Sequence, residues 1–332
     1  MVLAGVAAFT AGALTAFQSR ANAMLATTFQ SAIDAALWSF LSGWILLSLG
    51  LFHPKARAGL RRARQAYRDR HLAWWQFFGG LGGGFFVAAQ VWSVPQIGVA
   101  MFTMALVGGQ TTNALLVDGV GLGPAGRVPV SVTRVVAALG TFIGVGVAMA
   151  GRGGLGVHGV PVAAVLFAVA AGAGLAVQQA VNGRVNRHSG SVAATTWVNF
   201  TWGSGLLLGI LLTQVVRGTW SAPVSLDAPV WAWTGGMVGI VFVAVGAVVV
   251  HHLGVLLAAL LTLSGQLIGA VVVDLVSPGP AAHVDGIVLA GVALTLASAV
   301  GAAVAARRAR SGDDRAVNLD ATRCRQGAES GE

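Results

Sequence analysis

The stretch AGALTAFQSRAN at residues 11–22 returns as AGAGLAVQQAVN at residues 171–182. With this offset of 160, 11 of the 37 residues at 11–47 are identical to their counterparts. Residues 79–118 return at 235–274, at an offset of 156, with 14 identities in 40 positions. A period of about 155–160 residues is much longer than the 20–50 residues of a solenoid unit. The chain therefore contains a duplicated domain.

The composition indicates what was duplicated. The chain is 56% hydrophobic and 9% charged, with a mean hydropathy of +0.78, whereas about a quarter of the residues of a soluble domain are charged. A membrane-spanning helix needs about 20 mostly apolar residues. Ten segments meet this requirement, five in each copy: 2–19, 31–52, 74–94, 96–117, 132–150, 159–181, 191–214, 231–250, 253–275 and 284–306.

These segments predict an all-α integral membrane protein with ten transmembrane helices. We expect a first five-helix repeat at 1–152, a second at 153–306, and a basic, disordered cytoplasmic tail at 307–332. No charge precedes Arg20, whereas a signal peptide begins with a positive region, so we expect the first helix to be retained. The only cysteine, Cys324, lies in the tail and has no intramolecular disulfide partner.

The positive charges predict the orientation. With a cytoplasmic N-terminus, the inner loops and the tail hold 17 of the 20 Lys and Arg residues, and the outer loops hold only Arg20, Arg152 and Arg217. This distribution follows the positive-inside rule and predicts that both termini are cytoplasmic. The basic run at 55–70 is interpreted as a contact with anionic lipid headgroups, in preference to the nucleic-acid binding that a net charge of +9 would indicate in a soluble protein.

An odd number of helices in each copy makes the second copy enter the membrane in the opposite orientation to the first. The expected arrangement is therefore a pair of inverted-topology repeats. Secondary transporters use this arrangement, with a substrate site between the repeats near the bilayer midplane.

A further pattern consists of a glycine-rich first helix ending in Gln18 and Asn22, then Ser31 and Phe40, and a fourth helix ending in Asp118, followed by Gly123 and Arg134. These features resemble a known family, the YdcZ-type branch of the drug/metabolite transporter superfamily. In the second copy no arginine corresponds to Arg134. The resemblance implies an inner-membrane permease or exporter of small molecules, here as two fused five-helix halves. The equivalent residues of the second copy are Gln178, Asn182, Ser191, Phe200 and Asp274.

Duplicated amides are the candidate substrate-binding residues: Gln18, Asn22, Gln110, Gln178, Asn182 and Gln266. Gln18 and Asn22 are four residues apart and share a helical face, as do Gln178 and Asn182. Because a buried amide is costly without a hydrogen bond, these side chains either line a site or bond neighbouring helices together.

Three aspartates are candidates for ion coupling. Asp118 and Asp274 end equivalent helices, where a carboxylate can also simply face water. Asp34 has Ala194 as its counterpart and lies in an apolar stretch, and a carboxylate within a membrane segment is a functional candidate. We predict possible proton coupling through these three residues.

The function expected from the sequence is secondary active transport, in the direction of export, of a small polar or amphipathic organic molecule by alternating access. The chain has no P-loop, no H-E-x-x-H and no G-x-S-x-G motif, so neither an ATPase nor an enzyme is expected, and no cofactor, metal or nucleic-acid partner is predicted. A monomer is plausible because the halves are fused. The alternative is a structural or regulatory membrane protein without transport activity.

Overall fold

A computed structural model of the chain describes residues 2–123, 126–127, 130–151, 160–277, 279, 281–282 and 284–301. The predicted tail at 307–332, with Cys324, lies outside these ranges, and the side chain of Arg134 is not among those described.

The described residues form helices and no β-strand. Five helical segments are long and apolar enough to cross a membrane, namely α1, α2, Trp74–Gly119, α6 and α7. The α-helices are α1 (Val2–Phe29), α2 (Ala32–Gly50), α3 (Pro54–Arg68), α4 (Gly80–Gly119), α5 (Val132–Ala150), α6 (Val162–Ser189), α7 (Val192–Val216), α8 (Gly235–Val276) and a last helix at Gly286–Gly301. Short 3₁₀-helices, η1 (Trp74–Gly79) and η2 (Val230–Thr234), lead into α4 and α8.

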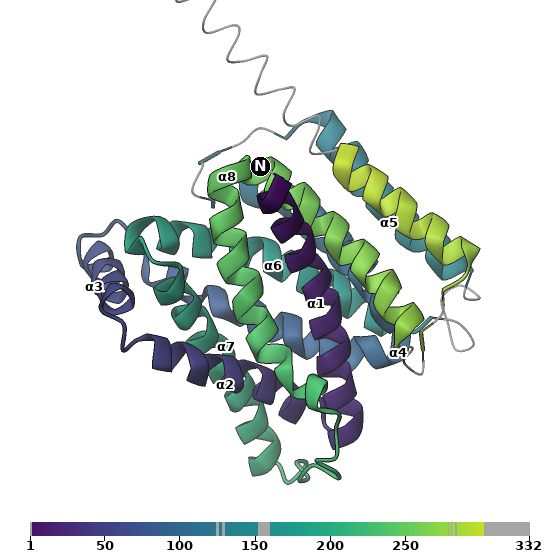
Figure 1. Ribbon diagram of the computed structural model, residues 1–332, viewed down its shortest axis with the longest axis horizontal. Helices are drawn as coiled ribbons and strands as arrows, with labels where there is room; N and C mark the ends of the chain where they lie inside the picture. Colours follow the sequence, from purple (N-terminus) through teal and green to yellow (C-terminus); the bar gives the residue numbers. More distant parts are fainter. Residues whose placement is uncertain are drawn as a thin grey trace, which may run out of the picture.

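Helix α4 consists of two helices in sequence. Gly98 has φ 78° and ψ 167°, a conformation accessible essentially only to glycine. It interrupts the helix three residues after the predicted boundary at residue 95 between two spans. A straight helix of 40 residues would be about 60 Å long, twice the hydrocarbon thickness of a bilayer. The 42-residue α8 has the same excess of length, and its green ribbon reverses direction near the top of Figure 1.

Two expectations about the loops are wrong. Helix α1 does not end at residue 19 but continues to Phe29, so Arg20 is part of a helix and is buried, not in an outer loop. The predicted loop at 53–73 contains α3, which begins with Pro54 at its first position and has the His53 side chain accepting a hydrogen bond from Lys55 N–H. The spacing of the small residues in α3, which form its buried face, was the signal for this helix.

Helices from different copies of the repeat pack closely through glycines. On α1, a Cβ at Gly12 would collide with the backbone of Thr262 and Gln266 on α8. The last helix lies beside α5 (Figure 1), with Gly291 against Gly144 and Ala148. Small residues allow such close approach of membrane helices.

These contacts are reciprocal between the two copies. Gly12 meets Thr262 and Gln266, and its equivalent Gly172 meets Leu106 and Gln110, which are the equivalents of those two residues. Gly265 likewise meets the carbonyl of Phe9, and Gly109 meets that of Val169. At these two crossings equivalent positions make equivalent contacts, and α1 packs on α8 as α6 packs on α4.

Candidate functional site

The four amides of α1 and α6 lie against glycines of the opposite copy. Gln18 Nε2 would be 3.2 Å from a Cβ at Gly239, and Gln178 Nε2 would be 3.1 Å from a Cβ at the equivalent Gly83. Glycine at both positions leaves the amides room next to the backbone of α8 and α4.

The asparagines one turn further on repeat this relationship. The Oδ1 atom of Asn22 lies against Gly235, and that of Asn182 lies against Gly79. These two glycines are equivalent in the repeat and lie where η2 and η1 lead into α8 and α4. The duplicated amide pairs therefore occupy equivalent surroundings at the interface between the copies.

Two phenylalanines lie between these amide groups. The rings of Phe40 on α2 and Phe200 on α7 contact each other with a centroid distance of 5.0 Å. The Phe40 ring also approaches the position of a Cβ at Gly83, as do Gln178 and the Asn199 side chain. The Phe200 ring approaches Gly239, next to Gln18. The structure thus brings Gln18, Asn22, Gln178 and Asn182 to one interface around an apolar centre.

The two amide pairs differ in burial. Gln18 and Asn22 are 6% and 0% exposed, whereas Gln178 and Asn182 are only partly buried. The same difference separates Gln266, which is buried, from its equivalent Gln110, which is partly exposed. Equivalent residues are therefore more accessible at the end of the interface where α6 and α4 terminate.

A chain of hydrogen bonds fixes the orientation of the Asn22 amide. The Ser19 hydroxyl donates to the Thr15 carbonyl at 2.9 Å, so its oxygen is left to accept from Gln90 Nε2 at 2.7 Å. Gln90 then accepts through Oε1 from Asn22 Nδ2 at 2.9 Å. Each hydroxyl has a single proton and each amide has one donating end. The side-chain oxygen of Asn22 is therefore the acceptor left without a donor in this series of hydrogen bonds.

Several of these amides have an unused acceptor. The side-chain oxygens of Asn22, Gln110, Gln178 and Gln266 are buried without a hydrogen-bond partner. Amides that served only to hold helices together would use both ends, because an unsatisfied buried polar atom costs about 1–3 kcal/mol. These four oxygens have no hydrogen-bond partner among the described residues.

Gln110 and Gln266 lie apart from the central four. Each is at a glycine-mediated crossing, Gln110 beside Gly172 and Gln266 beside Gly12. Gln110 Nε2 donates to Gln179 Oε1 at 3.0 Å. The structure places this pair at the α4–α6 and α1–α8 contacts, and no described contact joins them to the two phenylalanines.

Asp274 does not face water. It is 5% exposed, and it accepts hydrogen bonds from Val99 N–H at 3.0 Å and Ala100 N–H at 2.8 Å. These are the first amides after the break at Gly98, so the carboxylate caps the second half of α4, where the helix dipole favours a negative charge. An electrostatic interaction also links it to Arg20 of α1.

Arg20 and Asp274 are the only charged side chains among the buried residues that the structure describes. Arg20 also donates from Nε to the Ser277 hydroxyl at 3.4 Å and lies against Gly279. A buried charge is stable only when it is paired and hydrogen-bonded. The pair therefore ties α1 and α4 of the first copy to the end of α8 in the second.

The other two aspartates lie in more accessible places. Asp34 is in the first turn of α2, where it accepts from Trp220 Nε1 at 3.3 Å. Asp118 is in the last turn of α4 and is partly buried. Near it, Arg184 of α6 donates to the Gly121 carbonyl at 2.6 Å. Gly121 is the equivalent of Ser277. Arg20 of the first copy therefore binds the loop after α8, and Arg184 of the second copy binds the loop after α4.

The sequence interpretation missed Arg20, Arg184, Gln90 and Asn199 as members of these networks. The repeat alignment places Ala180 opposite Arg20, and Met24 opposite Arg184. Each arginine is therefore four residues, about one helical turn, from the position equivalent to the other, and the alignment does not pair them. Gln90 did carry a signal, because it is a polar residue within the apolar stretch 74–94. The described residues contain no group of three or more His, Cys, Asp or Glu side chains that could hold a metal ion.

The comparisons with known proteins agree with the duplication. The family DMT_YdcZ, described as "Putative inner membrane exporter, YdcZ", matches residues 3–147 and again residues 163–301. A solved structure named only "Crystal structure of protein" is similar over 92% of this chain and 97% of its own, with 17% identity and a TM-score of 0.50, which supports the fold alone. No curated protein matches the sequence. The two matches to one family cover nearly the whole described chain, which therefore belongs to the YdcZ family of inner membrane exporters.

Proposed function

We propose that this protein is a secondary active transporter that exports a small polar or amphipathic organic molecule. The observation that carries the proposal is the reciprocity of the interface: Gln18 and Asn22 meet Gly239 and Gly235 as Gln178 and Asn182 meet Gly83 and Gly79. Membership of a family of inner membrane exporters supports the same function.

The proposed mechanism is alternating access between two inverted repeats, at 1–152 and 153–306, with ten membrane crossings. Reciprocal contacts mean that the two ends of the interface are built from the same residue types. Opening one end while closing the other then exchanges equivalent contacts at little cost in free energy. The difference in exposure between Gln178 and Gln18 fits a state in which the end near Gln178 is the more open one.

The proposed substrate site consists of the six amides, with the four around Phe40 and Phe200 at its centre. Neutral amides hydrogen-bond a solute without burying an uncompensated charge, and the phenyl rings provide apolar surface for the body of the molecule. The unused acceptors of Asn22 and Gln178 are available for such bonds. No cofactor is required for this mechanism.

Proton coupling is proposed through the three aspartates. Asp34 and Asp118 are partly exposed, so their carboxylates are accessible from outside the protein. Asp274 is held by two backbone amides and interacts with Arg20, so a proton that reached it would weaken the contact between the copies.

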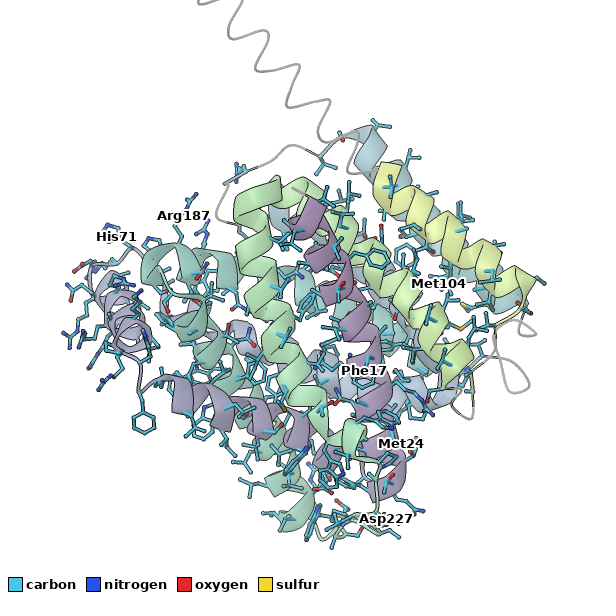
Figure 2. All side chains as sticks on the ribbon, viewed as in Figure 1. Phe17, Met24, His71, Met104, Arg187 and Asp227 are labelled. Atoms are coloured by element: carbon cyan, nitrogen blue, oxygen red, sulfur yellow. The ribbon has the colours of Figure 1, made fainter. Side chains whose placement is uncertain are left out.

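The proposed orientation places both termini in the cytoplasm. In Figure 2, His71 and Arg187 lie at one edge of the molecule, and Met24 and Asp227 lie near the opposite edge. The residues around His71 and Arg187 carry most of the described positive charge, as expected of a cytoplasmic surface.

Flux measurements on the purified full-length chain test the function. The protein is reconstituted in liposomes and a panel of small amines, alcohols, amides and amphipathic cations is screened for saturable flux. A reversible cross-link is then introduced by Gly82→Cys and Gly174→Cys in a Cys324→Ser background. A Cβ at Gly174 would lie 3.9 Å from Gly82 Cα, a separation close to that required for a disulfide.

Oxidation of the double variant should abolish the flux measured in its reduced form and reduction should restore it, whereas the flux of each single-cysteine variant should be the same before and after oxidation. Flux that survives the cross-link and does not saturate indicates a pore. An absence of flux for every compound, with the protein folded, supports the alternative of a structural or regulatory membrane protein.

A further inference from the structure

The surface helix α3 has two chemically different faces. Its buried face consists of small residues, namely Ala56, Gly59, Ala63 and Ala66. A Cβ at Gly59 would collide with Ser191 and approach Ala194 at the start of α7. This face is therefore closely packed on the turn between α6 and α7, and only the opposite face is available to a partner.

The opposite face carries four exposed arginines, Arg57, Arg61, Arg64 and Arg68. At 100° per residue their positions fall within about 60° around the helix axis, and they extend about 16 Å along it. Figure 2 shows many blue-tipped side chains around α3. We refer to these four residues as the arginine stripe.

The neighbouring polar residues leave the stripe largely unpaired. Asp69, the only acid in the segment 54–70, accepts a hydrogen bond from Gln65 Nε2 at 2.9 Å. Arg57 uses one donor for the Phe52 carbonyl out of the five that a guanidinium has. Arg62, on the side of the helix, is already committed to the Ser189 carbonyl at 2.7 Å.

We propose that the arginine stripe binds the phosphates of anionic phospholipids at the cytoplasmic surface of the membrane. Arginine binds phosphate with bidentate geometry, and a row of cations next to membrane spans attracts an anionic leaflet.

The short connections that join α3 to α2 and η1 favour lipid over nucleic acid as the partner of the arginine stripe. Helix α2 ends three residues before α3 begins, and η1 starts within six residues of its end. These connections span at most about 20 Å, so the helix stays near the membrane surface. Phe52 and Trp74 flank it at 78% and 63% exposure, and such aromatic residues are typical of the membrane–water interface.

Lipid binding on this face has a consequence for the second copy of the repeat. Gly59 and Arg62 attach α3 to Ser191 and Ser189 at the α6–α7 turn. A phospholipid that fixes α3 on the bilayer surface thereby also fixes this turn at the end of α6, the helix that carries Asn182.

The test compares the full-length chain in nanodiscs of phosphatidylglycerol and of phosphatidylcholine. Phosphatidylglycerol should raise the thermal unfolding midpoint, and the increase should shrink as NaCl rises from 50 to 500 mM because salt screens exposed charges. Arg61→Gln with Arg64→Gln should remove at least half of the increase. The matched control, Arg187→Gln with Arg217→Gln, also removes two exposed arginines and should retain it.

Arg62→Gln separates packing from lipid binding, since it should lower the midpoint equally in both lipids. An equal midpoint of the natural chain in the two lipids overturns the proposal. So does an equal loss of the increase in the stripe variant and the matched control. Stripe-dependent binding of a short RNA duplex to the nanodisc-embedded chain, without any preference for phosphatidylglycerol, would assign the surface to nucleic acid instead.

Discussion

Phe40 and Phe200 are equivalent residues of the two copies, and their rings contact each other at a centroid distance of 5.0 Å. Each ring also lies against a glycine of the helix that carries the other, Phe40 against Gly203 and Phe200 against Gly43. A residue can touch its own equivalent in this way only near an axis that relates the two copies. The amide pairs on either side of these rings are thus at matching distances from the centre of the interface.

Narrowing the interface at its glycines should reduce transport. A Cβ at Gly83 would be 3.1–3.2 Å from Gln178, Asn199 and Phe40, so Gly83→Ala should displace these side chains, and Gly239→Ala should displace Gln18. We expect flux in liposomes to fall at least tenfold with little change in the unfolding midpoint. Gly209→Ala, where a Cβ would meet nothing within 4 Å, is the control. Equal flux in all three variants would remove this interface from the transport path.

Removing the partly exposed amides should affect transport more than stability. Gln178→Ala and Asn182→Ala delete side chains of α6 that are only partly buried, and one of them has an unused acceptor. Saturable flux should decrease while expression and thermal unfolding in detergent stay close to those of the natural chain. If the midpoint drops and the surviving protein transports normally, the amides only bond helices together.

Removing either of the interacting buried charges, Arg20 or Asp274, should be strongly destabilising. Arg20→Gln leaves Asp274 buried without its cationic partner, and loss of one member of a buried pair costs about 3–5 kcal/mol. The unfolding midpoint in detergent should fall sharply for Arg20→Gln and for Asp274→Asn. The double variant should be less destabilised than the sum of the two, which a double-mutant cycle measures. Additive effects would show that the two side chains act independently.

The break in α4 should not tolerate a side chain. At Gly98 the backbone conformation disfavours any other residue by about 1–3 kcal/mol, and a Cβ would lie 3.1 Å from Asp274 Oδ2. Gly98→Ala should therefore lower the unfolding midpoint. Gly146→Ala in α5, with nothing within 4 Å of its Cβ, should leave the midpoint unchanged or raise it, because alanine favours helix. A tolerated Gly98→Ala would show that the break is not required.

The orientation can be measured at the only cysteine. Six positive charges in the tail predict that Cys324 is cytoplasmic. A membrane-impermeant maleimide should label it only after the cells are permeabilised, and a Cys324→Ser chain is the control for background. Labelling in intact cells would reverse the proposed orientation, together with the sides assigned to Asp118 and Asp274.

The sequence by itself determined the helical content, the duplication, the family and the equivalence of residues in the two copies. These are properties of local composition and of similarity along the chain: apolar length predicts a membrane helix, and an offset of 156–160 pairs Gln18 with Gln178. The prediction of α5 at 132–150 agrees with its observed bounds because the segment is mostly apolar and Arg134 is its only charged residue.

Only the tertiary structure decided which of these residues meet. Arg20 and Ser277 are 257 positions apart, and their contact depends on how α1 packs against the end of α8, which no local pattern records. The repeat alignment did not reveal that the two arginines have similar roles, because Arg20 and Arg184 are one helical turn away from equivalent positions. Helix α3 was predicted as a loop because it carries too many charges to cross a membrane. Its alanines and glycine are spaced as on one face of a helix, but only the folded chain shows that this face packs closely on α7.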